Sequence, residues 1–124
     1  MAYNEELADR IRQALKRHKN LEEKKMFGGL AFLLGGRMCC GVLNDNLVVR
    51  VGPERYAAAL SQAHTRPMDF NGRPLTGFVY VGLRGVKTDA ALAKWLREAT
   101  EYALTLPEGK AGAKRRKNRR RASA

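Results

Sequence analysis

The sequence is poor in cysteine and in long apolar runs. Its two cysteines are adjacent, at Cys39 and Cys40, and two neighbouring thiols build no disulfide framework. An intracellular, reducing environment fits this composition best. The longest apolar run, residues 30–34, is far shorter than the about 20 residues that a membrane-spanning helix needs. The polar, acidic N-terminus does not resemble a signal peptide. We therefore expect a cytoplasmic protein without a membrane segment.

Acidic residues are missing from the C-terminal end of the chain. Residues 110–124 carry eight basic residues and no large apolar side chain, whereas residues 1–109 hold sixteen basic and all twelve acidic residues. The eight basic residues are Lys110, Lys114, Arg115, Arg116, Lys117, Arg119, Arg120 and Arg121. A segment of this composition cannot bury enough apolar surface to offset its ordering entropy. We expect one folded domain over residues 1–109 and a disordered basic tail over residues 110–124.

The tail has two interpretations. It could be a solubilising extension, or it could contact the phosphates of DNA or RNA and release their counterions. Because no aromatic residue is interleaved in it, base stacking is excluded and such contact would be independent of sequence. The first helix offers further cations, with Arg10 and Arg17 on one face and Arg12, Lys16 and Lys19 on another. They could join the tail on a phosphate backbone, or form an ordinary solvated face.

Aromatic residues are also few, at 7%, so the 44% hydrophobic content predicts a mainly aliphatic core. Helices are expected over residues 4–18, 53–63 and 88–104, the first capped by Asn4 and the second beginning at Pro53. Strands are expected over residues 25–34, 37–43, 47–51, 68–70 and 77–83, with turns at Gly35-Gly36 and Asn44–Asn46. The Gly28-Gly29 pair inside the first strand indicates a bulge or a close backbone approach. The order α-β-β-β-α-β-β-α is typical of an α+β domain with helices packed on an antiparallel sheet.

Four blocks of the chain carry a family resemblance. Residues 26–32, MFGGLAF, resemble the MFGG signature of the TfoX N-terminal domain family, also called the TfoX/Sxy family. Residues 47–52, 66–70 and 77–81 resemble its next three blocks, in the same order. The resemblance spans about residues 5–104 and implies a secretion-chaperone-like α+β layer. The motif residues, which we interpret as structural, are Met26, Phe27, Gly28, Gly29, Arg50, Pro67, Met68, Asp69 and Phe70.

The resemblance also implies a function. Named family members regulate natural competence as coactivators alongside the cyclic-AMP receptor protein, and the family is not known for enzymatic activity. Those proteins carry a second, C-terminal helical domain, whereas this sequence shows only the basic tail after Leu106. We expect a non-enzymatic regulatory or adaptor domain, without cofactor or metal, that binds an unidentified protein partner and contacts nucleic acid nonspecifically through its tail.

Two alternatives remain open from the residues. Cys39 and Cys40 are expected on one strand with their side chains on opposite faces, one in the core and one partly exposed. They cannot then share one metal, but either could serve as a nucleophile with His64. Alternatively, the domain could be a self-associating structural module, such as a homodimer that covers a sheet face or edge. Arg50 is expected on the polar face of its strand, with Asp69 as a candidate carboxylate partner.

Overall fold

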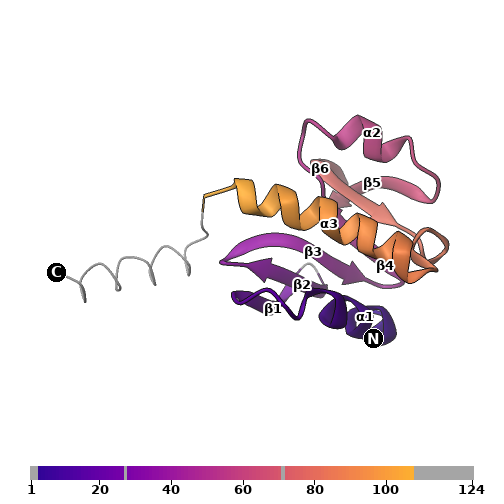
Figure 1. The fold of residues 1–124 in the computed structure, drawn as a ribbon. Coiled ribbons are helices and arrows are strands. Elements are labelled where there is room, and N and C mark those ends of the chain that lie inside the picture. Colours follow the sequence, from indigo (N-terminus) through magenta and orange to yellow (C-terminus); the bar gives the residue numbers. More distant parts are fainter. Residues whose placement is uncertain (1–2, 27, 71, 108–124) are drawn as a thin grey trace.

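The computed structural model describes residues 3–26, 28–70 and 72–107. The basic tail, with its expected disorder and nucleic-acid contacts, and the motif residue Phe27 lie outside these residues. The described residues form a six-stranded antiparallel sheet, in the order β1-β2-β3-β4-β6-β5, and three α-helices (Figure 1). The predicted α+β class is confirmed. The elements are α1 (Glu5–Leu15), β1 (Leu21–Met26), β2 (Gly29–Leu34), β3 (Arg37–Leu43), β4 (Asn46–Arg50), α2 (Tyr56–Leu60), β5 (Thr65–Phe70), β6 (Arg73–Val81), η1 (Leu83–Val86) and α3 (Asp89–Thr105).

The first expected strand is two strands, which adds an element to the predicted order. β1 and β2 pair as a hairpin in which Met26 lies opposite Gly29, and Gly28 adopts a left-handed φ of 78° at the turn. β1 escaped prediction because four consecutive charged residues give it no apolar alternation. At Gly29, a Cβ atom would lie 2.2 Å from the carbonyl oxygen of Val42. The predicted close backbone approach is therefore confirmed there, where β3 runs against β2.

The second helix is shorter than predicted. α2 covers only Tyr56–Leu60, so the prediction of a helix that begins at Pro53 and reaches residue 63 is wrong. The Ser61 hydroxyl donates to the carbonyl oxygen of Ala58, and the Thr65 hydroxyl donates to the carbonyl oxygen of Gln62. These local bonds satisfy the last carbonyl groups in place of a further helical turn. His64 then takes a left-handed φ of 66° and directs the chain into β5.

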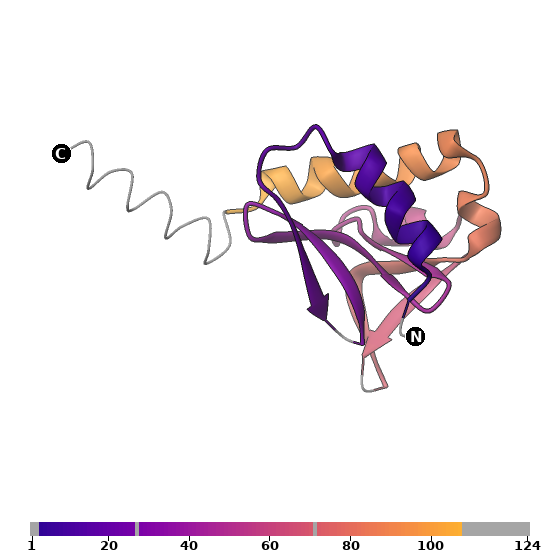
Figure 2. The ribbon, with the colours of Figure 1, turned by 90° about the horizontal axis from the view of Figure 1, so that it is seen from below.

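The other two helices begin where the sequence predicted. The side chain of Asn4 accepts a hydrogen bond from the Leu7 amide at 2.9 Å, and that of Thr88 accepts one from the Ala91 amide at 3.1 Å. Both helices lie on the same face of the sheet (Figure 2). Their apolar sides meet the sheet in one continuous core. Its buried members include Leu7, Ile11, Phe32, Val42, Val49, Val79, Trp95 and Leu96.

The opposite face of the sheet carries a second, smaller apolar cluster. Val48, Met68 and Tyr80 are buried there, and no helix residue among those described belongs to the cluster. Partly buried hydrophobic side chains surround them: Met38, Leu43, Leu75 and Phe78. We call this surface the outer sheet face.

Candidate nucleic-acid interface

The two cysteines lie on the same side of β3. The register of β2 and β3 shifts between Phe32, which faces Cys40, and Leu33, which faces Met38, so Cys39 is an extra, bulged residue. Both cysteine side chains are consequently in the main core, with 0% of each residue exposed. The prediction that they point to opposite faces, with one partly exposed, is wrong because a bulge interrupts the alternation of a strand.

The cysteines offer little nucleophilic chemistry. A hydrogen bond with the Cys39 side chain, together with burial, raises the pKa of the Cys40 thiol. A thiol held in its protonated form and out of solvent is a poor nucleophile. His64 is exposed in the turn between α2 and β5. Within the described part of the chain, no three side chains of the metal-binding types gather closely enough to hold an ion.

Arg50, the last residue of β4, contacts residues of β3, β6 and α3. Its guanidinium lies 5.2 Å from the ring centre of Phe78 and 5.7 Å from that of Tyr102. Its Nη1 atom donates to the carbonyl oxygen of Met38 at 3.5 Å. The hypothesis that Asp69 is its ion-pair partner is wrong: the described salt bridges do not join them. Asp69 instead lies near Tyr80, whose pKa is raised by burial and by this carboxylate.

The other motif residues occupy strand ends and turns. Met26 is the last residue of β1 and is 36% exposed, Gly28 lies in the turn, and Gly29 is the first residue of β2. Pro67 is exposed on the edge strand β5, and Met68 is buried on the outer sheet face. Phe70 ends the same strand opposite Arg73. Of these residues, Met68 packs in the smaller apolar cluster, Gly28 makes the hairpin turn and Gly29 makes the close approach to β3.

The structure divides the basic residues of the first helix into two groups. Arg10 bonds Asp89 at 3.2 Å, and Arg12 bonds both Asp9 and Glu23. Those two cations are neutralised by neighbouring carboxylates. α1 ends at Leu15, so the expectation that the helix reaches residue 18 is wrong. Lys16 and Arg17 follow the helix, are exposed and form no salt bridge with a described residue.

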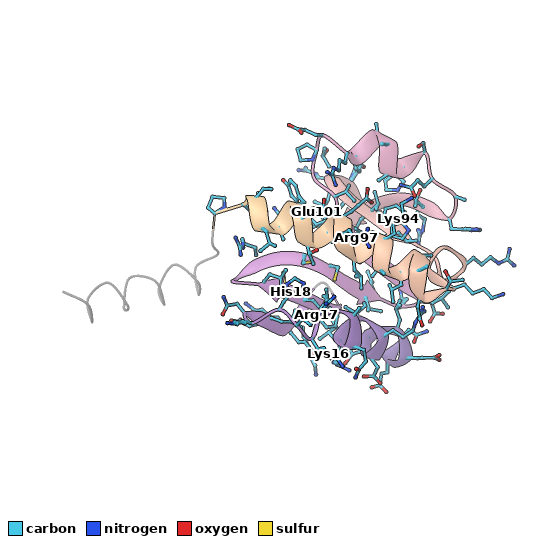
Figure 3. The ribbon with its side chains drawn as sticks, in the orientation of Figure 1. Lys16, Arg17, His18, Lys94, Arg97 and Glu101 are labelled. Carbon is cyan, nitrogen blue, oxygen red and sulfur yellow. The ribbon has the colours of Figure 1, made fainter. Side chains whose placement is uncertain are left out.

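α3 carries two further exposed cations, of which Arg97 lines a hollow beside α1 and Lys94 lies outside its lining. Lys94 and Arg97 are exposed one helical turn apart, and neither forms a salt bridge within the described ranges. Arg97 faces Arg17 and His18 across a hollow of about 220 Å³ between α1 and α3 (Figure 3). We call this surface the α1–α3 basic groove. The remaining residues that line its hollow are Ala14, Leu15, Ala93, Leu96 and Thr100.

No acidic residue lines the described hollow of the groove, although Glu98 follows Arg97 and has a buried carboxylate oxygen without a hydrogen-bond partner among the described residues. Glu101 lies one turn beyond Arg97, but it pairs with Arg55 at 3.7 Å. A second hollow at the opposite end of the α1–α3 contact is lined by Glu6, Asp9 and Asp89, with Arg10 among them. Asp9 and Asp89 in that hollow are paired with Arg12 and Arg10, so charges are balanced where the helices begin, whereas Arg17 and Arg97 have no salt bridge with a described residue further along.

Sequence reasoning found only part of this groove. It grouped the basic residues of the first helix but did not connect them with Arg97, which lies 80 residues beyond Arg17. Which face of α3 lies beside α1 depends on how both helices pack on the sheet, and local sequence spacing does not determine that packing.

The fold and the site together define a small α+β domain with a cationic groove on its helical side. Residues 13–103 match the TfoX N-terminal domain. Because the match covers most of the 124 residues, the chain belongs to the TfoX N-terminal domain family, as its motifs predicted. This is not a known enzyme family. No curated protein and no solved structure is significantly similar to the chain. None of the helices in the described ranges has the length and apolar character needed to cross a membrane.

Proposed function

We propose that this protein is a non-enzymatic regulatory domain that contacts nucleic acid through its α1–α3 basic groove and through residues 110–124. The observation that carries the proposal is the pair of exposed arginines that line the groove: Arg17 and Arg97 lack carboxylate partners among the described residues. Lys16 and Lys94 are exposed outside the lining of the hollow and extend the positive charge to either side of it. Family membership favours a role in transcription regulation, related to competence and exerted in the cytoplasm. Residues 110–124 contribute eight further basic residues that could contact phosphates.

The chemistry of the groove favours contact with phosphates. Arginine and lysine side chains bind phosphate oxygens and displace the counterions that surround a nucleic acid. No aromatic residue lines the described hollow, so its surface offers nothing on which a base can stack. Binding should then depend on charge and salt concentration, and little on base sequence.

A fluorescence-anisotropy titration with a mixed-sequence DNA duplex tests the proposal. The double variant R17E/R97E should weaken binding by at least about tenfold, or about 1.4 kcal/mol. Its logarithmic salt slope should become shallower by about 2, one unit for each lost phosphate contact. The matched control is R73E/R84E, which makes the same charge change at exposed positions in β6 and η1. Equal losses in both variants would show that net charge, and not the groove, determines binding.

The outer sheet face supports a second role, as an adaptor for a protein partner. Met38, Leu43, Leu75 and Phe78 are partly buried there without a covering helix among the described elements. Such side chains gain free energy when a partner removes them from water. A protein that binds this face should lose affinity for L43D and keep it for L104D, since Leu104 is exposed on α3. A concentration-dependent mass without a partner would point to self-association.

A further inference from the structure

A row of residues crosses the outer sheet face from one edge of the sheet to the other. It takes one residue from each strand, in the order Lys24, Ala31, Gly41, Val48, Tyr80 and Arg66. Only the two edge residues carry a charge, and both are exposed. The four residues between them are buried. The row therefore has an apolar middle and a cation at each edge.

Two aromatic rings of this face each lie beside a guanidinium. The Arg66 guanidinium lies 4.7 Å from the ring centre of Tyr80, and that of Arg50 lies 5.2 Å from the ring centre of Phe78. A guanidinium is a planar fork of N–H donors that matches the geometry of a carboxylate. Neither arginine forms a salt bridge with a described residue. Each pair thus offers a carboxylate-binding group directly beside an apolar ring.

Cations outnumber carboxylates around the outer sheet face. Arg73 stands two positions before Leu75 on β6, and Glu22 stands two positions before Lys24 on β1, so each shares the face of its neighbour. The cations are Lys24, Arg50, Arg66 and Arg73, and the carboxylates are Glu22 and Asp69, the latter near Tyr80. None of these cations forms a salt bridge within the described ranges. The charge of the face is therefore positive on balance.

Methionine supplies much of the apolar surface. Met68 is buried in the cluster, Met38 is partly buried beside it, and Met26 is 36% exposed two positions after Lys24. These are three of the four methionines in the chain. An unbranched thioether side chain adapts to apolar groups of different shape. The face therefore suits apolar side chains without requiring one particular shape.

We propose that the outer sheet face binds an acidic segment of a partner protein, in which apolar side chains lie between carboxylates. This inference rests on the proposed adaptor role and names the chemistry of the partner. The apolar side chains cover Met38 and Phe78, and the carboxylates pair with Lys24 and Arg66 at the edges. Five strand spacings of about 4.8 Å place these edges at most about 24 Å apart. About 7 extended or 16 helical residues span that distance.

Two other occupants fit this face less well. A second copy of the chain would bring two positive faces together across a two-fold axis, and their charges would repel. A single-stranded nucleic acid needs exposed rings on which its bases can stack. Tyr80 is only 6% exposed, and Arg66 lies over its ring.

A peptide selection on the full chain tests the proposal. A displayed library of random peptides about 16 residues long is selected on the unmodified chain and counter-selected on L43D. The enriched peptides should contain more Asp and Glu than the starting library. In an anisotropy titration, R66E should bind an enriched peptide about tenfold more weakly. R84E makes the same charge change in η1 and should weaken binding by less than about twofold. R17E/R97E, at the α1–α3 basic groove, should likewise have little effect.

Opposite charges at Leu43 report the charge of the partner. Both L43D and L43K remove the apolar contact, but only the aspartate repels an acidic peptide. L43K should therefore bind the peptide at least about threefold more tightly than L43D. Thermal unfolding shows whether both variants are folded. If they are not, L75D and L75K replace them, because Leu75 is also partly buried on this face.

The outcomes separate this inference from the adaptor role. If every enriched peptide binds L43D as tightly as the unmodified chain, the adaptor role fails and the inference fails with it. If the L43D-sensitive peptides are neutral or basic, or if L43K binds no better than L43D, only the acidic chemistry is overturned. An RNA oligonucleotide whose binding is weakened by L43D but not by R17E/R97E would assign the face to nucleic acid. A concentration-dependent mass that L43D abolishes would assign it to a second copy. Either result overturns the inference.

Discussion

The ring of Tyr102 packs directly against Gly52. A Cβ atom at Gly52 would lie 2.3 Å from Cε1 of this ring, and the glycine has a left-handed φ of 88°. The contact joins the end of α3 to the chain that leaves β4, beside the Arg50 guanidinium that lies near the same ring. It adds to the core packing that holds α3, the helix that carries Arg97, on the sheet.

Replacement of Gly52 by alanine should destabilise the domain strongly. G52A combines backbone strain with overpacking against Tyr102, and together these should lower the free energy of unfolding by about 2–4 kcal/mol. Urea unfolding followed by circular dichroism measures the change. G72A is the matched control, because Gly72 has a similar φ of 77° but no atom within 4 Å of an added Cβ. Similar losses in both variants would mean that the Tyr102 contact is unimportant.

Stability should fall at alkaline pH through the cysteine pair. The pKa of Cys40 is raised in the folded protein, so the unfolded chain loses this thiol proton first as the pH rises. The contribution is fully present below the ordinary thiol pKa of about 8.5 and declines above it. The variant C40A should unfold with a weaker pH dependence in this range, as measured by urea midpoints at several pH values. An unchanged dependence would assign the alkaline loss to other groups, such as Tyr80.

The two thiols should also resist modification in the native state. Both residues are 0% exposed, so a thiol reagent such as DTNB should react with them only as fast as the domain opens. In denaturant, both should react at once. Rapid labelling of the native protein would contradict the packing of Cys39 and Cys40 in the core.

Arginines of equal charge should contribute unequally to duplex binding. Arg12 already bonds two carboxylates, whereas Arg97 forms no salt bridge with a described residue. We expect R97Q to weaken binding by about 1 kcal/mol or more and R12Q by distinctly less. Anisotropy titrations at one low salt concentration compare the two. If R12Q has the larger effect, the assignment of the interface to the α1–α3 basic groove is wrong.

The N-cap of α3 should contribute measurably to stability. T88A removes the side-chain acceptor for the Ala91 amide and should cost about 1 kcal/mol. T105A, in the last turn of the same helix, removes only a hydroxyl that donates to the carbonyl oxygen of Tyr102. That exposed change should cost less than about 0.5 kcal/mol. Thermal unfolding of both variants provides the comparison.

Local signals predicted those parts of the fold that depend on neighbours in sequence. Asn4 and Thr88 were recognisable as helix starts, and the boundaries of β3 follow from the turns on either side of it. β1 could not be recognised, because a charged edge strand exists only through its pairing with β2. The bulge at Cys39 is equally invisible, since it is set by the register between two strands. The groove required the packing of α1 beside α3, and the row across the outer sheet face required the register of all six strands.

The charges along the α1–α3 contact are paired unevenly: Asp9 and Asp89 are in salt bridges at one end, and Arg17 and Arg97 have none with a described residue at the other. Near any polyanion, the end with the unpaired arginines is attracted more strongly than the paired end, which produces a torque before the surfaces touch. At physiological ionic strength this torque acts over a separation of about 8 Å. The domain would then arrive already oriented, with Arg17 and Arg97 foremost, and more of its collisions would be productive.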